Sequence, residues 1–427
     1  MRLDPNLHKF VSCRIPCPGM NTTFRILLLV CTSFVTLTQC KKDPEIELVK
    51  IADHAFLDAL IEAGVDTDGD GKICSCEAAD VHSLDVSNSD ISNMQGIEDF
   101  VHLVTLNCSG NQIGTLDVSN CIELEHLDCG NNQISTLDVS NCSALEHLDC
   151  SLNLLSNLDL STCTALDYFV CHMNQLTALD LSDNHQLFEL YADDNQISSL
   201  QFADGVSLWT ICCQNNQLTS LDVSHVNVTN LLCGNNPIST LDVSQNTYLM
   251  TLDCSRTQLT SIDVSNNSYL VGFGCGGLQL TSLDLSNNND LWRLYCDDNQ
   301  LTTLDLSGKT ELEILYCSHN DLIQLDVSES PLLRHFRCRN NQLSSLDLSN
   351  NLALTDIDCG RNLLSSLDIS QNINLGDNMW ESIPDISLDS MSTLYEVCVW
   401  EMPFPPEGLE IETTDSPNLY FTTECSK

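Results

Sequence analysis

Cysteine is the chemically versatile residue that recurs most regularly in this chain of 427 residues. Twelve of its 24 cysteines, together with Ala192, form a series with steps of 20 or 21 residues. Thiols in such a series could pair as disulfides, bind a metal or act as nucleophiles. The cysteines are Cys108, Cys129, Cys150, Cys171, Cys213, Cys233, Cys254, Cys275, Cys296, Cys317, Cys338 and Cys359.

A second candidate for chemistry is the acidic stretch DTDGDGKICSCE at residues 66–77. It matches the EF-hand calcium loop, with Asp66, Asp68 and Asp70 at ligand positions 1, 3 and 5. Lys72 offers its backbone carbonyl at position 7, and Glu77 occupies position 12. Calcium takes six to eight oxygen ligands, so the sequence predicts a calcium site here. The alternative is an acidic Asp-Gly turn without a metal.

Two further cysteine pairs lie outside the series. Cys74 and Cys76 are separated by a single residue, and no second pair follows them, which does not fit a zinc site. Cys398 and Cys425 flank the last segment and are a candidate disulfide if the protein is exported.

The elements that must position these residues follow a repeat of 21 residues, with one step of 20. Its unit is LxxLxCxxNxLxxLDVSxxxx, and an asparagine stands three residues after each cysteine except at Thr257 and Leu278. Thirteen units fill residues 103–375. The aliphatic residue that opens the LD[VL]S motif marks each unit: Leu116, Leu137, Leu158, Leu179, Leu200, Leu221, Leu241, Ile262, Leu283, Leu304, Leu325, Leu346 and Leu367.

This unit resembles the leucine-rich repeat, most closely the bacterial class with 21 residues and a nested period. The resemblance implies a mainly β solenoid of about thirteen coils, in which neighbouring coils bury each other's apolar side. Each LxxLxC and LxxLDV stretch alternates in polarity, so we expect two short parallel strands per coil, stacked about 4.8 Å apart. The asparagine should bond the next coil's backbone, and the coils of Thr257 and Leu278 should be weaker.

In such a stack the cysteines replace a core leucine, and a free cysteine behaves as a small buried hydrophobe. A straight column cannot surround a metal tetrahedrally. Cβ atoms about 4.8 Å apart are also slightly too distant for a relaxed disulfide. We therefore predict a ladder of reduced thiols in the core, with a disulfide ladder as the alternative.

The ends of the chain predict three further segments. Residues 1–40 read as a signal region with its true start at Met20, and LTQC resembles a lipoprotein box in which Cys40 is lipidated. Residues 41–102 should form a helical cap that contains the loop at 66–77. Residues 376–427 break the period and should form a C-terminal cap. The protein is then extracytoplasmic, either a lipoprotein of the outer membrane or cell surface, or secreted.

The charge restricts the partner classes. Sixty acidic residues face only 16 basic ones, giving a net charge of −44. A chain so acidic is not expected to bind nucleic acid, whose phosphates require lysine and arginine. It should contact a membrane only through a lipid anchor. The aspartate column that follows the marks should bond its own turns, and weak calcium binding there is the alternative.

The variable half of each unit is the expected recognition surface. All six arginines after residue 40 fall on this half or on the turn that follows it, and arginine with exposed aromatic rings is typical of interface centres. His126 and His147, on adjacent coils, are solvated side chains or, alternatively, metal ligands. The candidate binding residues are Tyr168, Phe188, Tyr191, Trp209, Trp292, Arg293, Tyr295, Tyr316, Arg334, His335, Arg337 and Arg339.

These features predict a cell-surface binding scaffold for protein–protein interaction or adhesion. The alternatives are a surface glycan-binding protein and a purely structural spacer. No nucleophile–base pair, closed metal triad or phosphate loop indicates an enzyme. The sequence leaves the ligand and the oligomeric state open.

Overall fold

The computed structural model describes residues 47–377 and 384–425. The predicted signal region, with Met20 and Cys40, lies outside these residues. The chain divides into the units Met1–Leu48 and Val49–Lys427, and the second unit is the one described below. Within the described residues, every helix is too short or too polar to cross a membrane.

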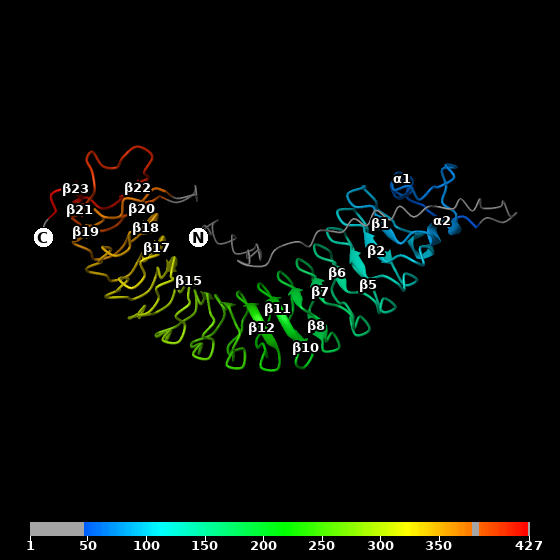
Figure 1. The fold of residues 1–427 in the computed structure, drawn as a ribbon, viewed down its shortest axis with the longest axis horizontal. Helices are drawn as coiled ribbons and strands as arrows, with labels where there is room; N and C mark the ends of the chain where they lie inside the picture. Colours follow the sequence, from blue (N-terminus) through cyan, green and yellow to red (C-terminus); the bar gives the residue numbers. More distant parts are fainter. Residues whose placement is uncertain (1–46, 378–383, 426–427) are drawn as a thin grey trace. The chain divides into compact units, whose positions relative to one another are not determined.

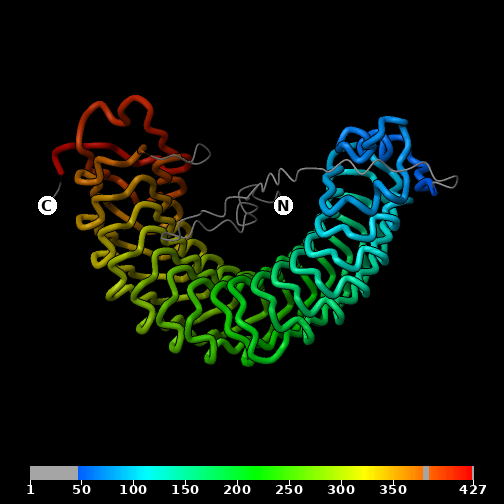
Figure 2. Tube along the Cα trace, turned by 45° about the vertical axis from the view of Figure 1, so that its right-hand side comes forward, coloured from blue at the N-terminus to red at the C-terminus, as the bar shows by residue number. Residues whose placement is uncertain are grey.

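The second unit is a stack of coils that follows an arc, built on one parallel sheet of sixteen strands (Figures 1 and 2). The strands of this long sheet lie on the inner side of the arc in Figure 1. They are β1 (Ser83–Asp85), β2 (Thr105–Asn107), β4 (His126–Asp128), β6 (His147–Asp149), β7 (Tyr168–Val170), β9 (Glu189–Tyr191), β11 (Ser207–Cys212), β12 (Asn227–Leu232), β13 (Thr251–Asp253), β14 (Gly272–Gly274), β15 (Arg293–Tyr295), β16 (Ile314–Tyr316), β17 (His335–Arg337), β18 (Asp356–Asp358), β20 (Ile386–Ser387) and β22 (Ile411–Glu412).

The predicted solenoid is confirmed, and it is longer than thirteen coils. Strand β1 adds a coil before residue 103, while β20 and β22 add two after residue 375. These three coils lack the cysteine–asparagine signature, which is why the repeat count missed them. The C-terminal segment thus extends the sheet itself, and the disulfide Cys398–Cys425 joins its outer side to the end of the described chain.

The expected second strand forms in only some coils. The outer strands are β3 (Leu116–Asp117), β5 (Leu137–Asp138), β8 (Ala178–Leu181), β10 (Ser199–Phe202), β19 (Ser366–Asp368), β21 (Glu396–Cys398) and β23 (Tyr420–Thr422). Elsewhere in the described coils this half runs directly into a turn. Because it lies on the outer side of the arc, adjacent coils spread apart there, and fewer interstrand hydrogen bonds can form.

The residues before the sheet form a small helical segment with α1 (His54–Glu62), α2 (Ser75–Ala79) and the 3-10 helix η2 (Ile97–Asp99). Asp53 caps α1 by accepting a hydrogen bond from the Ala55 amide at 2.8 Å. Its other oxygen accepts from the amide and hydroxyl of Ser92, which ties the helix to the first coil. Burial of the Asp53 carboxyl opposes its ionisation, but these hydrogen bonds outweigh burial and lower its pKa to about 2.

The core is one continuous column of aliphatic side chains and thiols. Every cysteine of the series is buried, and all twelve are free thiols, so the prediction of reduced cysteines is confirmed. Burial raises the pKa of these thiols, for example those of Cys296 and Cys317, far above the usual range. The ladder is therefore packing, and its thiols are poor nucleophiles.

The asparagine column links adjacent coils, as predicted, but each side chain bonds the preceding coil. Asn320 accepts a hydrogen bond from the Leu301 amide at 3.0 Å and donates to the Cys296 carbonyl at 2.9 Å. Thr257 in the same column donates only to Cys254 of its own coil, and Leu278 has no polar atom to offer. These two coils therefore lack the bond that the others share.

Candidate binding face

One side of the long sheet packs against the core, and the other faces away from it, on the inner side of the arc. We call this second side the inner face, and it carries the variable residues. In most strands the middle residue is buried while the first and third are partly exposed, as in β15, β16 and β17. This alternation follows from the two-residue period of a strand. Because the strands pair in register, outward residues of successive coils form columns across the inner face.

Five predicted residues lie on β15, β16 and β17 or directly before β15 and define the aromatic–arginine cluster. They form two contact groups, Trp292 with Arg293, and Tyr295 with Tyr316 and Arg337. The Tyr295 and Tyr316 rings pack edge to face with centroids 5.1 Å apart. The Arg337 guanidinium lies 4.3 Å from the Tyr316 ring centroid, and that of Arg293 lies 5.3 Å from the Trp292 centroid. Trp292 is 40% exposed, so the cluster presents apolar area and cationic edges to solvent together.

A carboxylate sits beside this cluster. Asp297 follows β15 and accepts a hydrogen bond from the Ser318 amide at 2.8 Å. Burial raises the pKa of the Asp297 carboxyl to about 7, although the hydrogen bond and the Arg337 charge act in the opposite direction. The same burial raises the pKa of Tyr316 to about 12. The Arg337 guanidinium thus lies over the Tyr316 ring, and its charge favours ionisation of the Asp297 carboxyl.

The other candidates on β17 and around it have partners within the chain. Arg334 pairs with Glu313 at 3.5 Å, and His335 is hydrogen-bonded to Asp356. Arg339 forms a two-pronged ion pair with Asp389, one contact being 2.6 Å. This last pair joins sequence positions 50 residues apart, so it fastens the predicted C-terminal segment to the coil of β17.

The aromatic residues of the N-terminal half do not form one group. Tyr168 starts β7 while Tyr191 ends β9, and their ring centroids are 5.8 Å apart. Phe188 directly precedes β9, and Trp209 lies within β11. Their rings stack with centroids 6.4 Å apart, in a column separate from that of Tyr168 and Tyr191. These four residues lie on the inner face but several coils from the aromatic–arginine cluster.

The predicted calcium loop brings its three aspartates together, with one oxygen of each lying within 4.8 Å of the others. Glu77 accepts hydrogen bonds from the Thr67 amide and from the Cys74 amide, which closes the loop. Sequence reasoning missed the disulfide between Cys74 and Cys76 within this loop. The His126 and His147 rings pack at a tilt with centroids 4.6 Å apart, and no group of three metal-ligating side chains among the described residues includes them.

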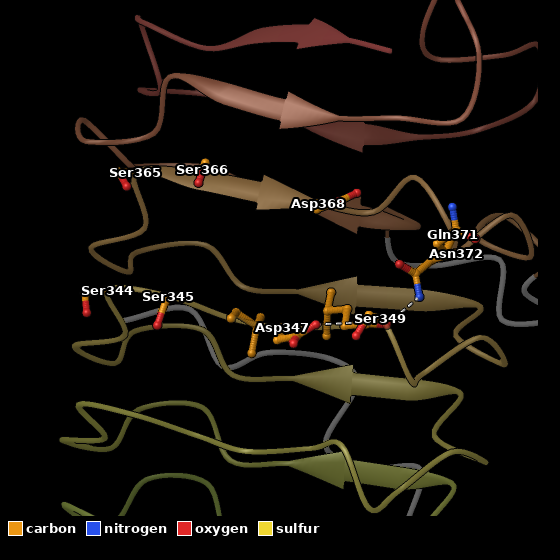
Figure 3. Close-up of a pocket in the computed structure, with 11 residues that line it drawn as sticks. Ser344, Ser345, Asp347, Ser349, Ser365, Ser366, Asp368, Gln371 and Asn372 are labelled. Carbon is orange, nitrogen blue, oxygen red and sulfur yellow. Dashed lines mark hydrogen bonds between the residues drawn. The ribbon is translucent and has the colours of Figure 1, made fainter. Parts of the chain in front are cut away.

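The outer half of the coils carries the aspartate column, and these aspartates bond their own turns. Asp347, for example, accepts from the Ser349 amide at 2.9 Å. Hydrogen bonds of this kind lower the pKa of the Asp347 carboxyl below its usual value. A depression of about 290 Å³ lies here, and its lining includes Asp347, Asp368, five serines and Asn372 (Figure 3). It opens where the outer strand β19 has no partner strand in the coil before it.

One feature of the inner face escaped the repeat analysis. The coil of β14 reads VGFGCGG, and its three outward positions, Gly272, Gly274 and Gly276, carry no side chain. The signal was present in the sequence as glycine at alternating positions, which is unusual inside a strand. This coil lies directly between β13 and the aromatic–arginine cluster.

Comparison with known proteins agrees with this architecture. Residues 101–142 match the family described as leucine-rich repeats in two copies. No curated protein sequence matches the chain. Two solved structures share the fold although their sequences are only 19% and 20% identical to this chain. A leucine-rich repeat protein from Leptospira interrogans is 19% identical, with a TM-score of 0.64, covering 82% of this chain and 97% of that one. YopM from Yersinia enterocolitica is 20% identical, with a TM-score of 0.53 and coverages of 80% and 70%.

A third solved structure is more similar. The functional domain of InlJ from Listeria monocytogenes, described as including a cysteine ladder, is 31% identical with a TM-score of 0.70. The match covers 83% of this chain and 78% of that domain. With this match and the coil architecture together, the chain belongs to the bacterial leucine-rich repeat family.

Proposed function

We propose that the protein is a non-catalytic binding scaffold that recognises a protein partner through its inner face. The observation that carries the proposal is the aromatic–arginine cluster on β15, β16 and β17. Tryptophan, tyrosine and arginine are the residues that dominate binding energy at protein interfaces. Here they gather on an exposed sheet face of a chain that has only six arginines after residue 40.

The preorganisation of the cluster supports the same function. Arg337 is held against Tyr316, and Arg293 is held over Trp292, so less side-chain freedom is lost when a partner binds. The rigid sheet beneath fixes the spacing of the columns. An interface that loses little conformational entropy on binding gains affinity without additional contact area.

The proposed location is the cell surface. The N-terminal segment has the composition of an export signal, and LTQC places Cys40 where a lipoprotein would carry its lipid. A lipid anchor at the N-terminus would leave the coils free to meet a partner outside the cell. Adhesion to another protein is the role that this arrangement supports best.

We also propose that residues 66–77 bind calcium. Asp66, Asp68 and Asp70 converge, and their carboxylate oxygens are the hard ligands that calcium prefers. Lys72 can add its backbone carbonyl, and Glu77 stands at the last ligand position. The ion would neutralise part of the loop's negative charge and stabilise the segment that precedes the first coil.

The binding proposal is tested by screening the full chain, in about 1 mM calcium, against cell-surface proteins and surface polysaccharides. The parent is compared with the double variant Trp292→Ala/Arg337→Ala. The control is Tyr248→Ala, because Tyr248 is 69% exposed and lies on the turn before β13, away from the cluster. A protein ligand lost in the double variant and kept in the control supports the proposal. A polysaccharide ligand, equal binding by both variants, or no ligand would overturn it.

A further inference from the structure

A row of apolar side chains follows the edge of the inner face where the inner strands begin. In six successive coils, from that of β9 to that of β15, the residue near the start of the inner strand is apolar five times and threonine once. Backbone hydrogen bonds link these residues from coil to coil, for example from the Trp209 amide to the Phe188 carbonyl at 2.7 Å. We call this row the apolar stripe, and its members are Phe188, Trp209, Thr229, Met250, Val271 and Trp292.

The apolar stripe is exposed along its whole length. Phe188, Met250 and Trp292 are 49%, 38% and 40% exposed, and the other three members are partly exposed. Three of its six residues are aromatic, in a chain that has only 6% aromatic residues. Contiguous exposed apolar side chains mark interaction sites, whereas single ones are ordinary. The apolar stripe therefore extends the candidate surface from Trp292 back to the coil of β9.

Acidic residues bound the apolar stripe unequally. The same column holds Glu125, Glu146 and Asp167 in the three coils before the stripe, and Glu313 in the coil after it. Glu313 pairs with Arg334, whereas no lysine or arginine among the described residues pairs with the three acids at the other end. One end of the stripe is therefore strongly negative, and the other end has its acid paired.

The spacing of the stripe favours a helix over an extended chain as its occupant. Neighbouring coils repeat about every 4.8 Å, so the five steps of the stripe span about 24 Å. A helix brings a side chain to the same face about every 5.4 Å and covers about 24 Å with 16 residues. An extended chain brings one to the same face only about every 6.6 Å. The mismatch per coil is about 0.6 Å for the helix and about 1.8 Å for the extended chain.

We propose that the apolar stripe seats an amphipathic helix of the protein partner, with basic residues at one end of that helix against Glu125, Glu146 and Asp167. The inference rests on the proposed function and adds the shape and charge of the partner. Burial of the helix's apolar side against the stripe supplies affinity, and charge-assisted hydrogen bonds to the three carboxylates fix its position. The net charge of −44 also speeds the approach of a basic partner and opposes an acidic one.

The test uses labelled synthetic peptides of about 20 residues and the full chain, with binding measured by fluorescence anisotropy. The probe peptide carries leucines at helical spacing and three lysines at one end, and both ends are tried. One counterpart replaces the lysines with glutamates, and another places the same leucines at alternating positions. The better lysine peptide should bind at least about tenfold more tightly than either counterpart, and salt should weaken its binding.

Matched variants locate the binding on the stripe. Met250→Asp places a charge in the middle of the stripe and should weaken binding about tenfold or more. Ile323→Asp makes a similar change at a residue that is 58% exposed on the outer half, and it should have no effect. Glu125→Gln/Glu146→Gln should weaken binding of the lysine peptide about tenfold. The control Glu401→Gln/Glu407→Gln changes the net charge equally at two exposed acids of the C-terminal segment and should not.

Three outcomes overturn the inference. They are equal binding of the lysine and glutamate peptides, equal binding of the helical and alternating peptides, and an effect of either control variant as large as that of its counterpart on the stripe.

The inference and the proposed function fail separately. If the peptide preference is missing but Trp292→Ala/Arg337→Ala still abolishes partner binding, the inner face binds a partner and the basic helix is wrong. If that double variant has no effect on the partner recovered in the screen, the proposed function is wrong whatever the peptides show.

Discussion

Replacing one asparagine of the column with alanine should destabilise the stack strongly at a single point. Asn320 donates to the carbonyls of Cys296 and Cys317, at 2.9 and 3.1 Å, and accepts from the Leu301 amide at 3.0 Å. Asn320→Ala leaves the Leu301 amide without a partner in a buried place, whereas the Cys296 carbonyl still accepts a hydrogen bond from Asn299 at 3.1 Å. An unpaired buried group costs about 1–3 kcal/mol and the lost hydrogen bonds to the two carbonyls add about 1 kcal/mol, so the loss should total about 2–4 kcal/mol.

Thr257 provides the matched control within the same column. Its hydroxyl makes a single hydrogen bond to Cys254 in its own coil, so Thr257→Ala should cost only about 1 kcal/mol. A substitution in the opposite sense, Thr257→Asn, supplies the missing hydrogen bond to the preceding coil and should stabilise the protein by about 1 kcal/mol. All three substitutions lie in the asparagine column, each changes one short side chain, and none alters the aliphatic core.

Hydrogen exchange measured by mass spectrometry reads the effect where it occurs, which matters because a coil stack need not unfold in one step. In Asn320→Ala the peptide containing Leu301 should exchange faster, while peptides near Asn132 stay unchanged. Urea unfolding of the full chain gives the total change. The reasoning is refuted if Asn320→Ala and Thr257→Ala cost the same, or if exchange at Leu301 does not accelerate.

Four other outcomes are expected. Gly360→Ala should disrupt the ion pair of Arg339 with Asp389, because the added Cβ would stand 2.8 Å from the guanidinium, and thermal melts should show lower stability than the parent. Asp297 has a folded pKa of about 7, above its unfolded value, so its contribution to stability should fall as pH rises from 4 to 7. Asp297→Asn should remove that pH dependence from urea melts; an unchanged slope would contradict it. Calcium at about 1 mM should stabilise the chain by about 0.4–1.4 kcal/mol, and Asp68→Asn should abolish this, whereas an unshifted parent melt argues against the site. The ladder thiols should resist a thiol reagent until urea unfolds the protein, and rapid labelling of native protein would show that they are accessible.

The repeat made the core predictable because it constrains residue type and period together. The leucine, cysteine and asparagine columns each repeat, so one coil predicts the packing of the next. The outer half was less predictable. Its LDVS motif alternates like a strand, but the arc separates the coils there, and curvature is a property of the stack that no single repeat encodes.

Much of the candidate site was predictable as a set of columns, whereas its pairings were not. The sequence places Arg293 and Arg339 on the same face, yet only the structure shows Arg339 paired with Asp389 and Arg293 without a carboxylate partner among the described residues. That difference arises from a contact between residues 50 positions apart. The disulfide Cys74–Cys76 was missed because the spacing was evaluated only for zinc.

The central claim is that a protein partner docks on the inner face at β15, β16 and β17. Its most direct test is hydrogen exchange of the full chain with and without the partner recovered in the screen. The account predicts protection of residues 291–297, 313–318 and 334–339. Protection confined to the outer half around Asp347 and Asp368, or to the segment before β1, would contradict it.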